Sequence, residues 1–333
     1  ARLPYRRPPL SKQVLTGEWP PERTHLLDAD ALDDLDLRVM LGSRASELDV
    51  AAHTVVVDGD LVPYDTLVVA TGVKARQLPG VGGVPGVHTL RTLDDVDAIR
   101  ADLETATRVV VVGAGVLGSE IASAARDLGL RVVLVGRTMA MRMGQVGDHL
   151  SARIEELHRA NGVDVRTGVD VVDVSEAGAH RLVALSDGEL VETDLVIAAI
   201  GGIPFTDWLA GSDLDLSDGV VCDASGLAAP DVYAVGDVAQ WRHEAGYPVP
   251  RAEHHLNAVE QALAVAHLLV TDEPPGAVVP FFWSELYDTR IQAYGRFAAD
   301  SPLEIIAGDM GDRRFVAASR DHGRTTGVVG WNM

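Results

Sequence analysis

The chain has 333 residues, of which 47% are hydrophobic and 23% charged, and this predicts a globular protein of two or three domains. Its formal net charge of −21 argues against nucleic acid and anionic membranes as partners, because both would be repelled. No apolar run is long enough to cross a bilayer and the amino end shows no secretory signal, so we expect a cytoplasmic protein.

Apolar runs in the first hundred residues predict short strands. We expect strands at 37–41 and 54–57, and a buried strand within 61–72 that closes on the turn Ala70-Thr71-Gly72. A short acidic helix is expected from Thr92 to Leu103. Thr92 is its predicted cap, and Asp95 stands three positions on, as in a capping box.

A glycine-rich turn, Gly113-Ala114-Gly115-Val116-Leu117-Gly118, follows a valine-rich strand expected at 108–112 and opens a helix. In such a turn the first glycine permits the tight bend, the second lets the backbone approach a pyrophosphate, and the third allows the helix to pack on the strand. The backbone amides at the helix start then face the phosphates. This pattern predicts a dinucleotide site.

The end of the next strand, expected at 131–135, lacks the acidic residue that usually accepts the ribose 2′-hydroxyl. Gly136 and Arg137 stand there instead. The Arg137 guanidinium suits a 2′-phosphate, which favours NADPH, but a solvated surface arginine explains it equally well. Both alternatives stay open, and so does the choice between NADH and NADPH.

The rest of the chain alternates between helices and strands, which predicts an α/β fold with a parallel sheet. The further expected elements are a helix at 146–160, strands near Asp164 and Leu182, strands at 195–200, 219–223 and 232–235, and a helix at about 256–269.

Two residue types exclude other kinds of site. The single cysteine, Cys222, excludes an internal disulfide and a CxxC relay, and its apolar neighbours predict a buried strand residue. The adjacent His254 and His255 have no further ligands at a metal-binding spacing. We therefore expect no metal site.

Several motifs, taken in order, resemble those of the two-nucleotide flavoprotein reductases, and among them the NAD(P)H-dependent ferredoxin reductases that feed oxygenases and cytochromes P450. These motifs are Pro4-Tyr5-Arg6-Arg7-Pro8-Pro9-Leu10-Ser11-Lys12, the Ala70-Thr71-Gly72 turn, the glycine-rich turn, Gly236-Asp237, Glu253-His254-His255-Leu256-Asn257-Ala258 and Pro280-Phe281-Phe282-Trp283-Ser284.

The resemblance implies two Rossmann-like nucleotide-binding domains and a carboxy-terminal α+β interface domain. An FAD domain would be split into residues 1–100 and 203–272 by an inserted NAD(P) domain at 101–202, and residues 273–333 would form the interface domain. In this family hydride passes from NAD(P)H to FAD, and single electrons then pass to a [2Fe-2S] ferredoxin. A rubredoxin reductase, an NADH oxidase and a catalytically silent NAD(P)-binding protein remain alternatives.

The resemblance also implies roles for single residues. Lys12 and Glu120 would form a catalytic pair beside the flavin, although Glu120 alone is also typical of a first helical turn. Asp237 would bind the flavin ribitol, and Arg91 would contact the flavin unless it pairs with Asp94 or Asp95. The other residues implied to contact cofactors are Arg7, Pro9, Ala45, Ala70, Thr71, Gly72, Gly201, Gly236, His254, His255 and Trp283.

The chain departs from the family in three places, one of which is Trp331-Asn332-Met333, where the resemblance implies a further terminal segment. The family begins with a strand, a glycine-rich turn and a helix that bind the ADP half of FAD, and this chain shows no such motif before residue 4. We therefore expect a shortened chain with weakened flavin affinity. His255 also replaces the family's commoner tryptophan. For docking to an acidic ferredoxin, the candidate basic residues are Arg290, Arg296, Arg313, Arg314, Arg320 and Arg324.

Overall fold

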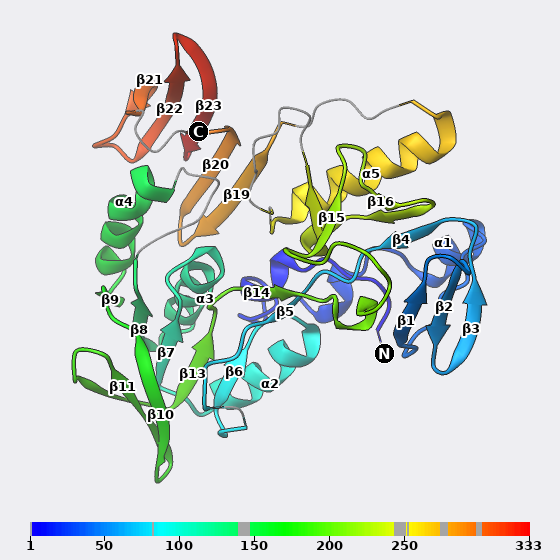
Figure 1. Cartoon of the computed structure of the whole chain (residues 1–333). Coiled ribbons are helices and arrows are strands. Elements are labelled where there is room, and N and C mark those ends of the chain that lie inside the picture. The colour runs from blue at the N-terminus through cyan, green and yellow to red at the C-terminus, as the bar shows by residue number, and fades with distance from the viewer. Residues whose placement is uncertain are drawn as a thin grey trace. The chain divides into compact units, whose positions relative to one another are not determined.

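The computed structural model describes residues 2–81, 83–138, 147–242, 251, 253–273, 279–297 and 302–333. The chain forms two compact units, which Figure 1 draws together and which are described separately below. The first unit comprises Ala1–Tyr5, His25–Lys74 and Gly202–Val279. The second unit comprises Arg6–Thr24, Ala75–Gly201 and Pro280–Met333.

The second unit contains a five-stranded parallel sheet. In spatial order its strands are β6 (Val87–Thr89), β13 (Leu195–Ala198), β7 (Arg108–Val112), β8 (Arg131–Gly136) and β9 (Asp164–Thr167). The central strands β7 and β13 are almost entirely buried, as expected for parallel strands covered on both faces. The predicted α/β class and the parallel sheet are confirmed.

The described residues of this unit form three α-helices: α2 (Leu93–Leu103), α3 (Val116–Asp127) and α4 (Gly147–Ala160). In Figure 1, α3 lies along β7 and β8, with which it is in contact. The predicted capping box of α2 is confirmed, because Thr92 Oγ1 accepts from the Asp95 amide (3.2 Å) while Asp95 Oδ2 accepts from the Thr92 amide (2.7 Å).

Two antiparallel sheets complete the second unit. The first consists of β10 (Val171–Ala177), β11 (His180–Leu185) and β12 (Leu190–Thr193), and its apolar side packs against the valines of the parallel sheet. The second has the order β19 (Phe281–Leu286), β20 (Thr289–Gly295), β23 (Arg324–Trp331), β22 (Arg314–Asp321) and β21 (Glu304–Asp309). Two 3-10 helices, η1 (Pro8–Ser11) and η2 (Pro21–Thr24), lie in its amino-terminal segment.

The first unit is built from short strands. One sheet is antiparallel, with β1 (Ala45–Asp49), β2 (Thr54–Val57) and β3 (Asp60–Pro63); a second has the order β16 (Leu227–Ala229), β17 (Val232–Ala234) and β4 (Leu67–Val69); and β15 (Val220–Cys222) pairs with β18 (Ala239–Trp241). Its other elements are α1 (Ala29–Asp34), α5 (His255–Thr271), η3 (Asp207–Leu209) and η4 (Gly236–Val238). The chain passes between the units after Tyr5, Thr24, Lys74, Gly201 and Val279. The third crossing lies within β5 (Val73–Ala75), and the fourth lies just before β14 (Gly202–Pro204).

Two predictions for this unit have different outcomes. Cys222 is buried in the apolar core with Leu48, Val69 and Val232, as predicted. The strand predicted at 37–41 is wrong, because this segment has no regular structure and its apolar side chains are exposed. An apolar run becomes a strand only where a neighbouring strand pairs with it, and none does so here among the described residues.

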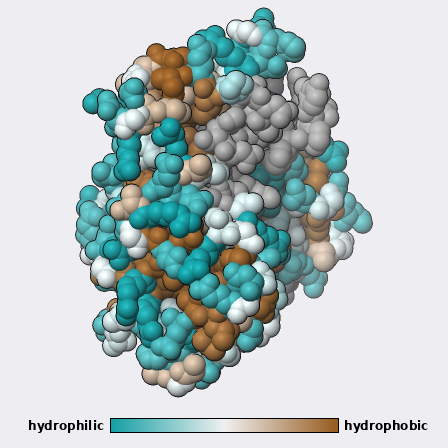
Figure 2. Space-filling view, turned by 90° about the vertical axis from the view of Figure 1, so that its left-hand side faces the viewer, coloured by the Kyte–Doolittle hydropathy of each residue, from teal (hydrophilic) through white to brown (hydrophobic). Residues whose placement is uncertain are grey.

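Figure 2 shows the side of the molecule that lies at the left of Figure 1, where α4, β10 and β11 are found. Hydrophilic residues cover most of this face, and apolar residues form separate patches among them. No helix within the described residues is both long enough and apolar enough to span a membrane.

Candidate functional site

The glycine-rich turn joins β7 to α3, as predicted. Gly113 has a positive φ of 108°, and a Cβ atom there would lie 2.3 Å from the Ala199 carbonyl oxygen. A Cβ atom on Gly118 would lie 1.7 Å from the Gly113 carbonyl oxygen. Both positions therefore exclude a side chain.

Gly115 is the extended residue that precedes α3, and Val116 and Leu117 begin the helix. The first amides of a helix have no partner within it and attract anions. The turn thus has the backbone shape that a dinucleotide pyrophosphate requires.

Gly136 and Arg137 end β8 and lead into the following loop. Arg137 is exposed, and its Nε atom donates to Asp170 Oδ1 at 2.6 Å. The two alternatives for Arg137 both fit this position, since the guanidinium is at the surface and carries one ion pair. Gly201, which follows β13, accepts from the Arg76 amide (2.9 Å).

The second unit also holds a buried carboxylate on α3. Glu120 is 6% exposed, and three groups surround it. Lys12 Nζ lies 2.8 Å from Oε2, Ser11 Oγ lies 2.6 Å from Oε2, and Ser284 Oγ lies 2.8 Å from Oε1. Lys12 and Glu120, which the resemblance paired, are thus in direct contact. Both serines were missed as site residues, although each lies inside one of the quoted motifs.

The segment that carries Lys12 is held by its own turn. Prolines at 8 and 9 open η1, Pro9 is buried, and its carbonyl accepts from the Lys12 amide (3.1 Å). Lys12 Nζ also donates to the Pro8 carbonyl at 3.2 Å. Proline fixes the backbone here, so the ammonium group is directed towards Glu120 by a locally rigid turn.

A pocket of about 160 Å³ lies against this pair. Its wall includes Lys12, Glu120, Asp127 and Tyr287. Burial raises the pKa of Asp127, and burial also raises that of Tyr287. The pocket gives the otherwise buried pair a polar opening.

Arg7 and Arg91 meet in the same unit, where Arg7 Nη1 donates to the Arg91 carbonyl. The backbone amide of Arg91 donates to Asp95 Oδ2 at 2.9 Å. The Asp95 carboxylate therefore accepts hydrogen bonds from the backbone amides that precede α2. The contact of the Arg91 side chain with the flavin, and its alternative of an ion pair with Asp94 or Asp95, stay predictions.

Trp283 lies on β19 next to Ser284. It stacks on Phe281, with 6.0 Å between ring centroids and 15° between ring planes, and Phe281 in turn stacks on Tyr294. Because neighbouring strand residues point to opposite faces, Trp283 lies on the face of the sheet opposite the serine that contacts Glu120.

The first unit holds the other predicted residues. The Gly236 amide donates to Gln261 Oε1 (2.7 Å), and the Asp237 carbonyl accepts from Arg251. His254 is the N-cap of α5, since its Nδ1 accepts from the Leu256 amide (3.3 Å), and His255 is the first helical residue. Gln261, Arg251 and this capping role were not predicted.

The turn after β4 belongs to the same unit. Thr71 Oγ1 donates to the Phe205 carbonyl (2.9 Å), and the Gly72 carbonyl accepts from the Phe205 amide (2.9 Å). Ala70 is exposed, and Ala45 is half-buried at the start of β1. Ala70, Thr71 and Gly72 thus follow β4, and Gly236 and Asp237 follow β17, whereas Ala45 begins β1 and His254 and His255 lie at the start of α5.

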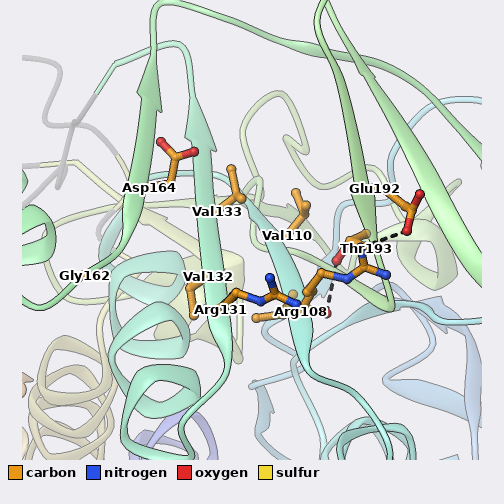
Figure 3. Close-up of a pocket in the computed structure, with 10 residues that line it drawn as sticks. Arg108, Val110, Arg131, Val132, Val133, Gly162, Asp164, Glu192 and Thr193 are labelled. Atoms are coloured by element: carbon orange, nitrogen blue, oxygen red, sulfur yellow. Dashed lines mark hydrogen bonds and ion pairs between the residues drawn. The ribbon is translucent and has the colours of Figure 1, made fainter.

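A further pocket, of about 320 Å³, lies at the opposite ends of the same parallel strands (Figure 3). Arg108 lies at its rim and binds Glu192 at 2.8 Å, as the figure shows, and Asp194 at 3.0 Å. Burial raises the pKa of Asp194, but hydrogen bonds from Thr107 and Arg108 outweigh burial and hold it well below its usual range. The charged groups of Arg108, Glu192 and Asp194 pair with one another, so we assign this network to the stability of the fold.

Comparisons with known proteins agree on one kind of relative. The profile of the family described as pyridine nucleotide-disulphide oxidoreductase matches residues 1–262. The ferredoxin reductase subunit of 5,5'-dehydrodivanillate O-demethylase from Sphingobium sp. is 38% identical over 320 residues, covering 94% of this chain and 77% of the relative. The ferredoxin–NAD(+) reductase component of the p-cumate 2,3-dioxygenase system from Pseudomonas putida is 34% identical and covers 93% and 76%.

Solved structures give the same result. A ferredoxin reductase for the CYP199A2 system from Rhodopseudomonas palustris matches with a TM-score of 0.93 at 30% identity, covering 99% of this chain and 82% of that one. A covalent complex of putidaredoxin reductase with putidaredoxin matches with a TM-score of 0.92 at 30% identity, covering 100% and 82%.

Proposed function

Because the chain belongs to the pyridine nucleotide-disulphide oxidoreductase family, among its ferredoxin reductases, we propose that it is an FAD-dependent NAD(P)H:ferredoxin oxidoreductase. The observation that carries the proposal is the buried Lys12–Glu120 pair, whose carboxylate lies on the helix that begins at the glycine-rich turn. One helix therefore supports both the nucleotide turn and a largely buried ion pair.

Cysteine content supports electron transfer without a dithiol. Cys222 is the only cysteine, and burial raises its pKa to about 12. A thiol of this kind is neither paired nor ionised at neutral pH, so it cannot serve as a redox relay. This disfavours, for this chain, the dithiol chemistry of disulfide reduction that the family name includes.

The flavin, when bound, supplies the conversion of a two-electron hydride donor into a source of single electrons. We propose that Gly236, Asp237 and Thr71 of the first unit help to hold it. In the second unit, Glu120 and the Pro8 carbonyl hold the Nζ atom of Lys12 in place. Gly113, Gly115 and the first amides of α3 would hold the pyrophosphate of NAD(P)H.

The proposed acceptor is a [2Fe-2S] ferredoxin that serves an oxygenase or a P450. Relatives named as reductase components of such systems support this acceptor. All six candidate docking arginines are exposed, and two of them form ion pairs, Arg290 with Glu285 and Arg320 with Glu304. Reversing the charges of Arg313, Arg314 and Arg324 should slow ferredoxin reduction but leave dye reduction unchanged; equal slowing of both would refute this docking surface.

The test of the main proposal is an anaerobic titration of the purified chain, with and without added FAD, in which NADPH or NADH is added and the flavin absorbance is followed. We expect the absorbance to bleach. Glu120→Gln should slow bleaching by about tenfold, the effect of one charge-assisted contact. Glu176→Gln, at an exposed position on β10, is the matched control and should leave the rate unchanged. Nucleotide binding without any flavin would refute the proposal in favour of a silent NAD(P)-binding protein.

A further inference from the structure

The end of β8 cannot carry the carboxylate that normally selects NADH. A Cβ atom on Gly136 would lie 2.8 Å from the Ala114 Cβ and 3.0 Å from the Ala114 nitrogen. Ala114 belongs to the glycine-rich turn, so any side chain at 136 would displace the turn itself. Recognition of the adenosine 2′ position must therefore come from other residues near this strand end.

Arg137 is the next residue and is positioned for this role. Its side chain is 81% exposed, and its Nε atom donates to Asp170 Oδ1 at 2.6 Å. Asp170 is the only side chain among the described residues that pairs with it. This contact occupies the Nε side of the guanidinium and leaves the N–H groups of Nη1 and Nη2 available.

Asp170 lies 33 residues from Arg137 in the sequence and is itself held in place by Ser186. Its amide donates to Ser186 Oγ (3.0 Å), and its carbonyl accepts from the Ser186 amide (2.9 Å). The Arg137 carbonyl also accepts from the Gly168 amide (3.1 Å). The loop between β9 and β10 is thus tied to the strand end that carries Arg137.

We propose that Asp170 is a positioning residue that holds Arg137 by its Nε atom and presents the two Nη groups to the 2′-phosphate of NADPH. A guanidinium matches the geometry of a phosphate when two parallel N–H groups face it. A side chain already held in one orientation loses less entropy when the phosphate binds. This selectivity for NADPH over NADH rests on the proposed function, because it concerns the same nucleotide site.

The test measures binding without flavin or hydride transfer. Adenosine 2′,5′-bisphosphate and 5′-AMP are titrated separately into the full chain by calorimetry. We expect the bisphosphate to bind at least about tenfold more tightly, the gain from one charge-assisted contact. Arg137→Gln should bring the two affinities within about twofold of each other. The control is Arg131→Gln, an exposed arginine at the start of the same strand, and it should keep the wild-type ratio.

Asp170 variants separate positioning from charge. Asp170→Ala removes the acceptor and should reduce the preference for the bisphosphate by about threefold, less than one full charge-assisted contact. Asp170→Asn keeps an acceptor for Nε and removes the negative charge, so it should retain the wild-type preference or exceed it. A wild-type ratio in Asp170→Ala would overturn the positioning role.

Two further outcomes separate this inference from the proposed function. Equal affinity of the wild-type chain for both nucleotides would overturn NADPH selectivity and leave the dinucleotide site standing. Failure of both nucleotides to bind would overturn the dinucleotide site of the proposed function, and this inference with it.

Discussion

Replacement of Glu120 by glutamine tests whether Lys12 and Glu120 stabilise the fold as an energetically coupled pair. The side chains of Lys12 and Glu120 are 14% and 8% exposed, so neither charge is well solvated. Glutamine keeps the volume and an acceptor for the serine hydroxyls but leaves the Lys12 ammonium without an anion. Breaking a buried pair from one side typically costs about 3–5 kcal/mol. We expect a loss at the lower end, about 3 kcal/mol, because the amide retains hydrogen bonds.

The reverse change should cost less. Lys12→Met removes the ammonium, but Glu120 keeps its hydrogen bonds from Ser11 (2.6 Å) and Ser284 (2.8 Å). Hydrogen bonds to a charged group contribute about 1.5–3 kcal/mol each, so we expect a loss of only about 1–2 kcal/mol. The double variant has no unpaired charge and should be about 2 kcal/mol more stable than the sum of the two losses predicts.

The assay is urea unfolding of the four proteins, followed by tryptophan fluorescence and circular dichroism, with Glu176→Gln as the control. The free energy of unfolding is compared across the cycle. If the losses in the double variant add to within about 0.5 kcal/mol, the two groups are not coupled and the reasoning is wrong.

Three other predictions concern the same fold. Burial lowers the pKa of His158 to about 4 in the folded protein. As the pH falls below about 6.5, this histidine therefore binds a proton in the unfolded chain before it does so in the folded one. About 2 kcal/mol of the free energy of unfolding should be lost between pH 7 and pH 5. His158→Gln should remove this loss from urea midpoints measured at both pH values; an unchanged slope would contradict it. Gly118→Ala should abolish the binding of 5′-AMP in calorimetry, whereas Glu176→Gln, at an exposed position on β10, should keep it, and binding by Gly118→Ala would contradict the tight turn. Cys222 should not react with a thiol reagent until urea unfolds the chain, and rapid labelling of the native protein would show that it is not buried.

Sequence patterns correctly predicted those parts of the fold that depend on residues close together in the sequence. The valines at 108–112 form β7 because a parallel strand buried on both faces is apolar throughout. The capping box at Thr92 was predictable because both of its hydrogen bonds join residues three positions apart. The apolar segment 37–41 failed as a strand because pairing depends on a partner that the segment itself does not reveal.

The site was predictable only in part, for the same physical reason. Lys12 and Glu120 were paired by resemblance and not by spacing, since they lie on separate segments. Ser11 and Ser284 lie 109 and 164 residues from Glu120 in the sequence. No local sequence pattern predicts that a serine hydroxyl will contact a residue so far away. His254 was not predicted as a helix cap, because the N-cap position usually holds Ser, Thr, Asp or Asn.

The contacts of the Glu120 carboxylate also form in a fixed order while the protein is being synthesised. Its partners Ser11 and Lys12 come from the start of the chain and Ser284 comes from β19, so Ser284 is made long after the other two. A nascent chain can form the parallel sheet once residue 201 has left the ribosome, because domains generally fold as units during synthesis. Until β19 arrives, Glu120 Oε1 lacks the Ser284 hydroxyl, and water has access to the position that this hydroxyl later fills. We expect the nascent protein to pass through a stage in which the nucleotide turn is complete while the ion pair beside it is still hydrated.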